Sequence, residues 1–154
     1  MAEYNVMGDK VNNVPAPKTL SVNQRQAGTA TGSTNTLIIR YLNALVALGA
    51  GITYQASSAN GDSFLINEAG IYSVSVTMAN YNGMAMRVMA GPTLTQSINQ
   101  IYEIGRLDFI ADEVAMNTTW VGYIPAGYVV YVWANNTPFN DEDGSNQITV
   151  ARVG

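Results

Sequence analysis

The side chains that could do chemistry in this sequence are mostly carboxylates. Asp141, Glu142 and Asp143 stand together in a polar stretch, and carboxylate oxygens are ligands that Ca²⁺ prefers. The stretch lacks the alternating Asp spacing and distal Glu of a calcium loop, so we interpret it as a solvated acidic loop. A glycosidase would need a pair of carboxylates, but two carboxylates occur in almost any sequence, so we do not expect an enzyme. The residues that could supply such a pair are Glu68, Glu103, Asp108, Asp112 and Glu113.

The chain contains no histidine and no cysteine. This inventory excludes Ser-His-Asp triads, cysteine nucleophiles, disulfides, and zinc sites built from imidazole or thiolate. Met84, Met86 and Met89 stand at strand spacing, where methionine fills a core or a subunit contact rather than forming a cofactor box. We therefore expect no cofactor and no metal.

Length and charge indicate one domain with few kinds of partner. At 154 residues and 47% hydrophobic composition, the chain can bury one core. Only 12% of residues are charged, and the net charge is -4 without a basic cluster, so nucleic-acid binding is not expected. The first residues lack the apolar core of a signal peptide. The most apolar run, Leu37 to Ile52, is short and contains Arg40 and Asn43, so no membrane span is expected.

The clearest structural pattern lies in the stretch from Phe64 to Met78. Tyr72, Val74, Val76 and Met78 alternate with small hydroxyl residues. Successive side chains of a strand point to opposite faces, so this stretch predicts a half-buried strand with one apolar and one polar face. A second alternating run precedes it across a turn that contains a glycine.

Short alternating runs and turn signals continue along the chain. They predict an antiparallel sandwich or barrel built from many strands. The further runs are Ile52–Tyr54, Met84–Val88, Ile101–Ile110, Thr118–Ile124 and Gln147–Val153.

The stretch from Leu37 to Leu48 is ambiguous. Its apolar residues fall at helical spacing, with Thr36 as a possible N-cap and Gly49 as a possible stop. The residues from Leu37 to Tyr41 also alternate, which is typical of a strand.

The run from Tyr128 to Trp133 is apolar on both faces. In an antiparallel protein this means that both faces are covered. One face can meet the domain's own core, and a neighbouring subunit is the simplest cover for the other. The alternative is that these aromatic side chains are ordinary core residues.

Residues 1–35 differ in composition from the rest of the chain. They hold few large apolar residues, and residues 28–35 form a small polar tract without periodicity. We place the domain boundary near Thr36, with an extended arm at 1–35 and a domain at 36–154. The arm is either a frayed terminus or an anchor that orders on a partner surface. As an anchor it would use its isolated apolar residues Tyr4, Val6, Val11, Val14 and Leu20.

Three stretches together resemble the jelly roll of the complement globular-head and tumour necrosis factor superfamily. They are Phe64–Tyr72 with its Ala-Gly-Ile-Tyr corner, Ile124–Val132 with its Pro-Ala-Gly corner, and the terminal run Ile148–Val153. The segment Gly51–Tyr54, which precedes these stretches, is similar to the corresponding part of bacteriophage fibre and capsid decoration domains and of C-terminal domains of spore-surface glycoproteins. The resemblance implies an all-β antiparallel jelly-roll sandwich and a strand, not a helix, at Leu37–Tyr41. The sequence departs from the family pattern in two ways. Tyr128 stands where an acidic residue often follows the Gly, and no collagen-like tract precedes the domain.

The resemblance also implies a compact homotrimer. A trimer would explain why a strand is apolar on both of its faces. The candidate interface residues are Tyr72, Tyr123, Tyr128, Tyr131 and Trp133.

Two functions fit these expectations. The first is a structural virion protein, a trimeric capsid decoration or head fibre of a bacteriophage that the arm anchors to a capsid protein at the particle surface. The second is a recognition module that binds a host glycan or protein receptor through loops such as Thr93–Asn99 and Thr137–Asn146. Tyr81, Trp120 or Phe139 could then stack on sugar faces. The absence of a long repetitive shaft favours the structural role.

Overall fold

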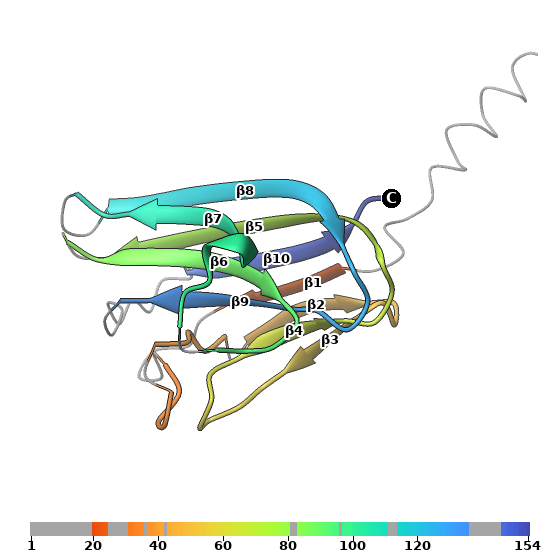
Figure 1. Cartoon of the computed structure of the whole chain (residues 1–154), viewed down its shortest axis with the longest axis horizontal. Helices are drawn as coiled ribbons and strands as arrows, with labels where there is room; N and C mark the ends of the chain where they lie inside the picture. Colours follow the sequence, from red (N-terminus) through yellow and green to blue (C-terminus); the bar gives the residue numbers. More distant parts are fainter. Residues whose placement is uncertain are drawn as a thin grey trace, which may run out of the picture.

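The computed structural model describes residues 20–24, 31–35, 37–41, 43–80, 83–95, 97–110, 114–135 and 146–154 (Figure 1). These residues form strands and one 3-10 helix of three residues, η1 (Gln100–Tyr102). In the part of the chain described, no helix is long and apolar enough to cross a membrane. The strands are β1 (Leu20–Gln24), β2 (Asn43–Leu48), β3 (Ile52–Gln55), β4 (Ser63–Ile66), β5 (Gly70–Asn80), β6 (Ala85–Gly91), β7 (Glu103–Asp108), β8 (Val114–Ile124), β9 (Val129–Ala134) and β10 (Gln147–Arg152).

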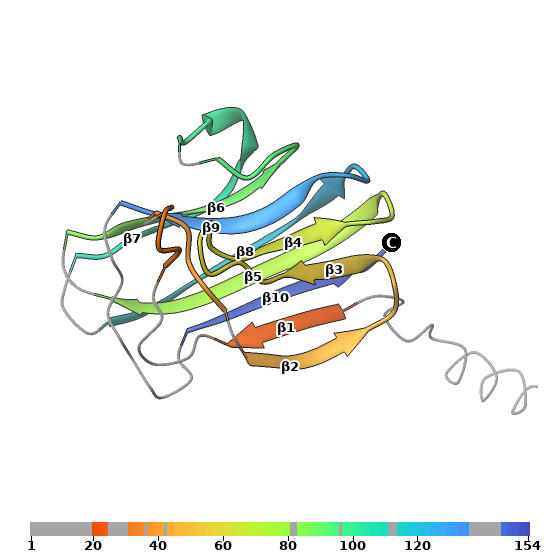
Figure 2. The same ribbon diagram turned by 90° about the horizontal axis from the view of Figure 1, so that it is seen from below.

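The strands form two five-stranded antiparallel sheets that pack face to face. One sheet has the order β2-β1-β10-β5-β8, and the other has the order β3-β4-β9-β6-β7. Figure 2 shows β2, β1 and β10 side by side along one edge of the molecule. The predicted all-β antiparallel jelly-roll sandwich is confirmed, and of the predicted N-terminal arm, residues 1–19 lie outside the described part.

The core lies between the two sheets, and β5 provides one wall of it. Tyr72, Val74, Val76 and Met78 are buried, whereas the hydroxyl residues between them point outward, as the alternation predicted. Burying a side chain of this size stabilises the fold by about 1.5–3 kcal/mol. The facing sheet supplies the opposite wall with Phe64, Ile66, Met86, Val88, Val130 and Val132.

The helical interpretation of Leu37–Leu48 is wrong. Residues 43–48 form β2, and the strand expected at Leu37–Tyr41 is not formed either, because Ile38 and Ile39 make only isolated bridges to Trp133 and Thr31. Both isoleucines are fully buried, but Ile39 packs in the core between the sheets and Ile38 packs on the outer side of β9. An extended chain buried on both sides produces a continuous apolar run, and such a run can match helical spacing by chance.

The second face of β9 is covered by the chain itself, which corrects the expectation that a neighbouring subunit covers it. Val129 and Tyr131 belong to a small apolar cluster with Ile38 and Met89 on the outer side of the sheet. The segment around Ile38 and the loop after β6 lie over these residues. The partly buried residues that complete the cluster are Leu65, Leu94, Tyr102 and Trp133.

Strand β1 lies within the stretch for which the sequence predicted an arm. Its five residues pair with β10 on one side and β2 on the other, so Leu20 stands in register with Ala151 and Leu48. The sheet therefore extends further toward the N-terminus than a boundary at Thr36 allows. Leu20 and Val22 alternate with Ser21 and Asn23, but so short a run carries a weak signal.

A buried carboxylate holds the crossing segment, residues 37–41, in place. Asp62 is fully buried and accepts hydrogen bonds from the Tyr41 N–H at 2.6 Å, the Tyr54 hydroxyl at 2.6 Å and the Ser57 N–H at 2.9 Å. Arg40 approaches the same carboxylate, with its Nε 3.7 Å from Oδ1. These contacts tie the crossing segment to β3 and to the loop before β4.

Candidate functional site

The candidate functional site is the outward face of three neighbouring strands, β10, β5 and β8. Because the strands are in register, their outward residues form rows across β10, β5 and β8, and the first row takes Val153, which directly follows β10. We call this surface the assembly face. From one end to the other its rows are Val153–Ile71–Tyr123, Ala151–Ser73–Val121, Thr149–Ser75–Thr119 and Gln147–Thr77–Asn117.

One end of the assembly face is apolar and open to solvent; we call it the apolar end. Tyr123 is 62% exposed, Val121 is 61% exposed and Val153 is 59% exposed. Ile71 is exposed beside them and is held in place by a hydrogen bond from the Val153 N–H to its carbonyl at 2.8 Å. Leu48 of β2, also exposed, extends the apolar end through the register of β1. Contiguous exposed apolar patches of large area mark interaction sites.

The other end of the face consists of hydroxyl and amide side chains; we call it the polar end. Asn117 donates from Nδ2 to the Ser75 Oγ at 3.2 Å and to the Thr77 Oγ1 at 3.1 Å. The Thr119 hydroxyl donates to the same Ser75 oxygen at 3.1 Å. On β10, Gln147 donates to Thr149 at 3.4 Å. These side chains form a lattice of hydrogen bonds across the strands.

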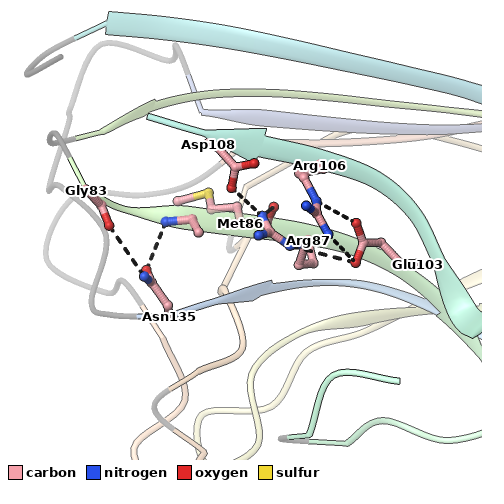
Figure 3. A network of polar contacts seen from close by, with 8 residues as sticks. Gly83, Met86, Arg87, Glu103, Arg106, Asp108 and Asn135 are labelled. Atoms are coloured by element: carbon pink, nitrogen blue, oxygen red, sulfur yellow. Dashed lines mark hydrogen bonds and ion pairs between the residues drawn. The ribbon is translucent and has the colours of Figure 1, made fainter. Parts of the chain in front are cut away.

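No residue of the assembly face carries a formal charge, whereas the outer face of the other sheet does (Figure 3). There Arg87 of β6 lies 2.8 Å from Asp108 and 3.7 Å from Glu103, both on β7. Arg106 pairs with the same Glu103 at 2.9 Å. The two arginines and two carboxylates balance one another, so this network joins β6 to β7.

Of the predicted interface residues, Tyr123 is the most exposed and lies on the assembly face. Tyr72 is fully buried in the core, where its hydroxyl donates to the Glu68 carbonyl at 2.6 Å and burial raises its pKa. Tyr131 is buried in the outer cluster, and burial raises its pKa as well. Neither Tyr72 nor Tyr131 has surface to give to a partner. Tyr128 and Trp133 are half-buried, and the Tyr128 ring packs edge-on against Tyr102 with centroids 6.1 Å apart.

Sequence reasoning missed the residues that surround Tyr123. Ile71 and Val121 flank it because β5 and β8 pair antiparallel, with Ile71 opposite Tyr123 and Ser73 opposite Val121. Each strand by itself alternates in the ordinary way, so the signal is visible only when the two strands are aligned with one another. The anchor candidates Tyr4, Val6, Val11 and Val14 lie outside the described residues. The fifth candidate, Leu20, lies in β1 and pairs with β10 and β2, so it belongs to the sheet and not to a free arm.

The carboxylates singled out in the sequence do not form a reactive pair among the residues described. Glu68 is ion-paired with Arg152, while Glu103 and Asp108 belong to the network with Arg87. Across the described ranges, no group of three or more acidic residues could hold a metal ion. Asp112, Glu113 and the acidic loop at 141–143 lie outside these ranges.

The loops named for recognition are described in part. Trp120 packs against the core, and its ring covers Gly122, where an added Cβ would lie 2.3 Å from Cζ2. It is therefore not free to stack on a ligand. The loop after β6 exposes Ile98 and Ile101 near its tip. Tyr81, Phe139 and residues 137–145 lie outside the described part.

No protein-family model matches the sequence, and no protein of curated function matches it. Solved structures do match the fold. Murine APRIL superposes with a TM-score of 0.63 at 12% sequence identity, over 88% of this chain and 98% of that chain. PRD1 vertex protein P5 gives 0.57 at 17% identity over 90% and 99%, and GITRL from bushbaby gives 0.54 at 8% identity over 88% and 93%. These likenesses show a tumour necrosis factor-like jelly roll, and at such identities they show the fold alone.

Proposed function

We propose that this chain is a structural virion protein that assembles as a homotrimer, a capsid decoration or head-fibre protein at the surface of a bacteriophage particle. The observation that carries the proposal is the exposed apolar end of the assembly face. The likeness to PRD1 vertex protein P5 supports a place on a virus particle.

The physical case for self-assembly rests on exposed area and charge. Fully burying a valine side chain stabilises by about 1.5–3 kcal/mol relative to leaving it in water, so covering Val121 and Tyr123 would contribute substantially. The side chains of the four rows carry no formal charge in a chain of net charge -4, so these side chains bring no like charges together when copies meet. A second copy therefore fits this face better than a strongly charged partner does.

We assign the attachment role to the N-terminal arm, because the assembly face would be occupied by other copies. Strand β1 belongs to the sheet, so we assign the attachment role to residues 1–19, which precede it in the sequence. An extended chain spans at most ~3.3–3.6 Å per residue, which gives this arm a reach of roughly 60 Å. Deleting residues 1–19 should leave the trimer intact and abolish attachment to the capsid, and a truncated protein that still attaches would refute the anchor role.

The assembly itself is tested by solution mass. Sedimentation equilibrium at micromolar concentration should give a trimer for the full chain. The double variant Val121→Ser/Tyr123→Ser should give a monomer with an unchanged far-UV spectrum. Ile110→Ser is the matched control, because Ile110 is 86% exposed but lies off the assembly face, and this variant should stay trimeric. A double variant with wild-type mass would contradict the proposal.

A second candidate function, recognition of a host protein, is favoured by the tip of the loop after β6. Ile101 is 84% exposed there, and Asn99 fixes η1 by accepting a hydrogen bond from the Ile101 N–H at 3.2 Å. An exposed isoleucine on a fixed loop suits a protein surface better than a glycan. If the recognition role is correct, Ile101→Ser should lower binding of the trimer to host cells, and equal binding by the variant would count against it.

A further inference from the structure

We infer that the polar end of the assembly face determines how the copies align with one another, while the apolar end supplies most of the affinity. This inference rests on the proposed homotrimer and assigns separate tasks to the two halves of its contact surface. The occupant of the polar end is a second copy of this chain.

The division of the face follows directly from its rows. Along a strand, outward residues recur every two positions, at about 6.6–6.8 Å. The rows that contain Tyr123 and Val121 are mainly apolar, and the rows that contain Thr119 and Asn117 consist entirely of hydroxyls and amides. The boundary between apolar and polar rows lies between Val121 and Thr119, two residues apart on β8. A copy that covers the apolar end therefore also lies next to the polar end.

Apolar contacts alone fix position poorly. The hydrophobic effect is non-directional, so another copy can slide or rotate on the apolar end with little change in free energy. Hydrogen bonds have strict distances and angles, and a buried polar group without a partner costs free energy. Each polar group left unpaired should disfavour a misplaced copy by roughly tenfold. A single polar residue that fixes register in an otherwise apolar contact is the best-attested use of buried polar groups.

The polar end has hydrogen-bonding capacity left for a partner. The Ser75 oxygen accepts from Asn117, and the single bond between the Ser75 and Thr119 hydroxyls uses one of their two protons, so the other proton is left for a partner or for the long contact with Asn117. The Asn117 carbonyl oxygen receives only a long contact of 3.5 Å from Thr119. Donors and acceptors therefore remain available to a second copy of the chain.

The test replaces the polar end by apolar groups of similar shape and measures the distribution of masses. Asn117→Leu/Thr119→Val changes exposed side chains, so the domain should keep its melting transition. We expect this variant to associate at least as tightly as the wild type but to lose the single trimer mass and form a mixture with larger species. The control is Thr53→Val, because Thr53 is an exposed hydroxyl residue of β3 on the other sheet. The control should remain a uniform trimer.

A distance measurement separates alignment from simple aggregation. The chain has no cysteine, so Asn60→Cys provides one exposed site for a spin label away from the assembly face. The label should give one narrow inter-copy distance in the wild-type background and a broad distribution in the Asn117→Leu/Thr119→Val background.

The outcomes distinguish this inference from the proposed function. A uniform trimer with a narrow distance in Asn117→Leu/Thr119→Val would overturn the inference and leave the homotrimer intact. A wild-type chain that stays monomeric would overturn the homotrimer and the inference together. Loss of association in Asn117→Leu/Thr119→Val would also overturn the inference, because it would make the polar end the source of affinity.

Discussion

Replacing Asp62 should destabilise the domain more than replacing any exposed carboxylate. Asp62 is fully buried and accepts hydrogen bonds from Tyr41, Tyr54 and Ser57, with Arg40 3.7 Å away. Asp62→Ala removes the acceptor oxygens of the Tyr41 and Ser57 N–H groups, whereas the Tyr54 hydroxyl keeps its contact with the Tyr41 carbonyl, and a buried donor that loses its acceptor costs about 1–3 kcal/mol. Breaking a buried charge pair costs about 3–5 kcal/mol in total, so we expect a loss of about 4 kcal/mol for the alanine variant. Asp62→Asn keeps one acceptor oxygen and should lose about 2 kcal/mol.

The assay is urea unfolding followed by fluorescence of the two tryptophans at one fixed protomer concentration, because assembly adds to apparent stability. Asp108→Asn is the control, since Asp108 is half-exposed and its pair with Arg87 lies on the surface, where such pairs contribute about 0–1 kcal/mol. An Asp62→Ala variant within about 1 kcal/mol of wild type would refute the role assigned to this carboxylate.

Two further predictions concern the same region. Gly61→Ala should be severely destabilising, because Gly61 has φ +79° and an added Cβ would lie 2.5 Å from the Ile38 Cβ. Gly83 has φ +80° but open space around it, so Gly83→Ala should lose only about 1–2 kcal/mol of stability. Equal melting temperatures for the two variants would contradict this prediction. Burial and the hydrogen bond to Asp62 raise the pKa of Tyr54 above its ordinary value of 10.0. The stability that the protonated Tyr54 hydroxyl contributes is fully present below about pH 10 and is lost as the pH rises above it. The urea midpoint should therefore fall less for Tyr54→Phe than for wild type between about pH 9 and about pH 11. An equal fall in both proteins would exclude Tyr54 as a source of alkaline sensitivity.

The fold was predictable where one strand carries its own signal. Tyr72 to Met78 alternates cleanly because β5 has one face in the core and one face outward, and period alone identifies such a strand. The stretch from Leu37 to Leu48 was harder to assign, because Ile38 and Ile39 are buried on opposite sides of an extended segment and the resulting run imitates a helix.

The candidate site was predictable only in part. Tyr123 was identified as an interface residue, but Ile71 and Val121 gain their meaning from the register between β5 and β8, which a single sequence does not contain. Tyr131 was predicted at the interface together with Tyr123, yet the loop after β6 and the segment at Ile38 cover it. Burial by a distant segment cannot be read from local pattern, so an apolar strand face is weak evidence for a partner until the tertiary cover is known.

The measurement that tests this account most directly is the solution mass of the full chain at micromolar concentration, made alongside Val121→Ser/Tyr123→Ser. We predict a trimer for the wild type and a folded monomer for the double variant. A wild-type monomer, or a double variant that remains trimeric, would contradict the central claim that the open face of β10, β5 and β8 is where the copies meet.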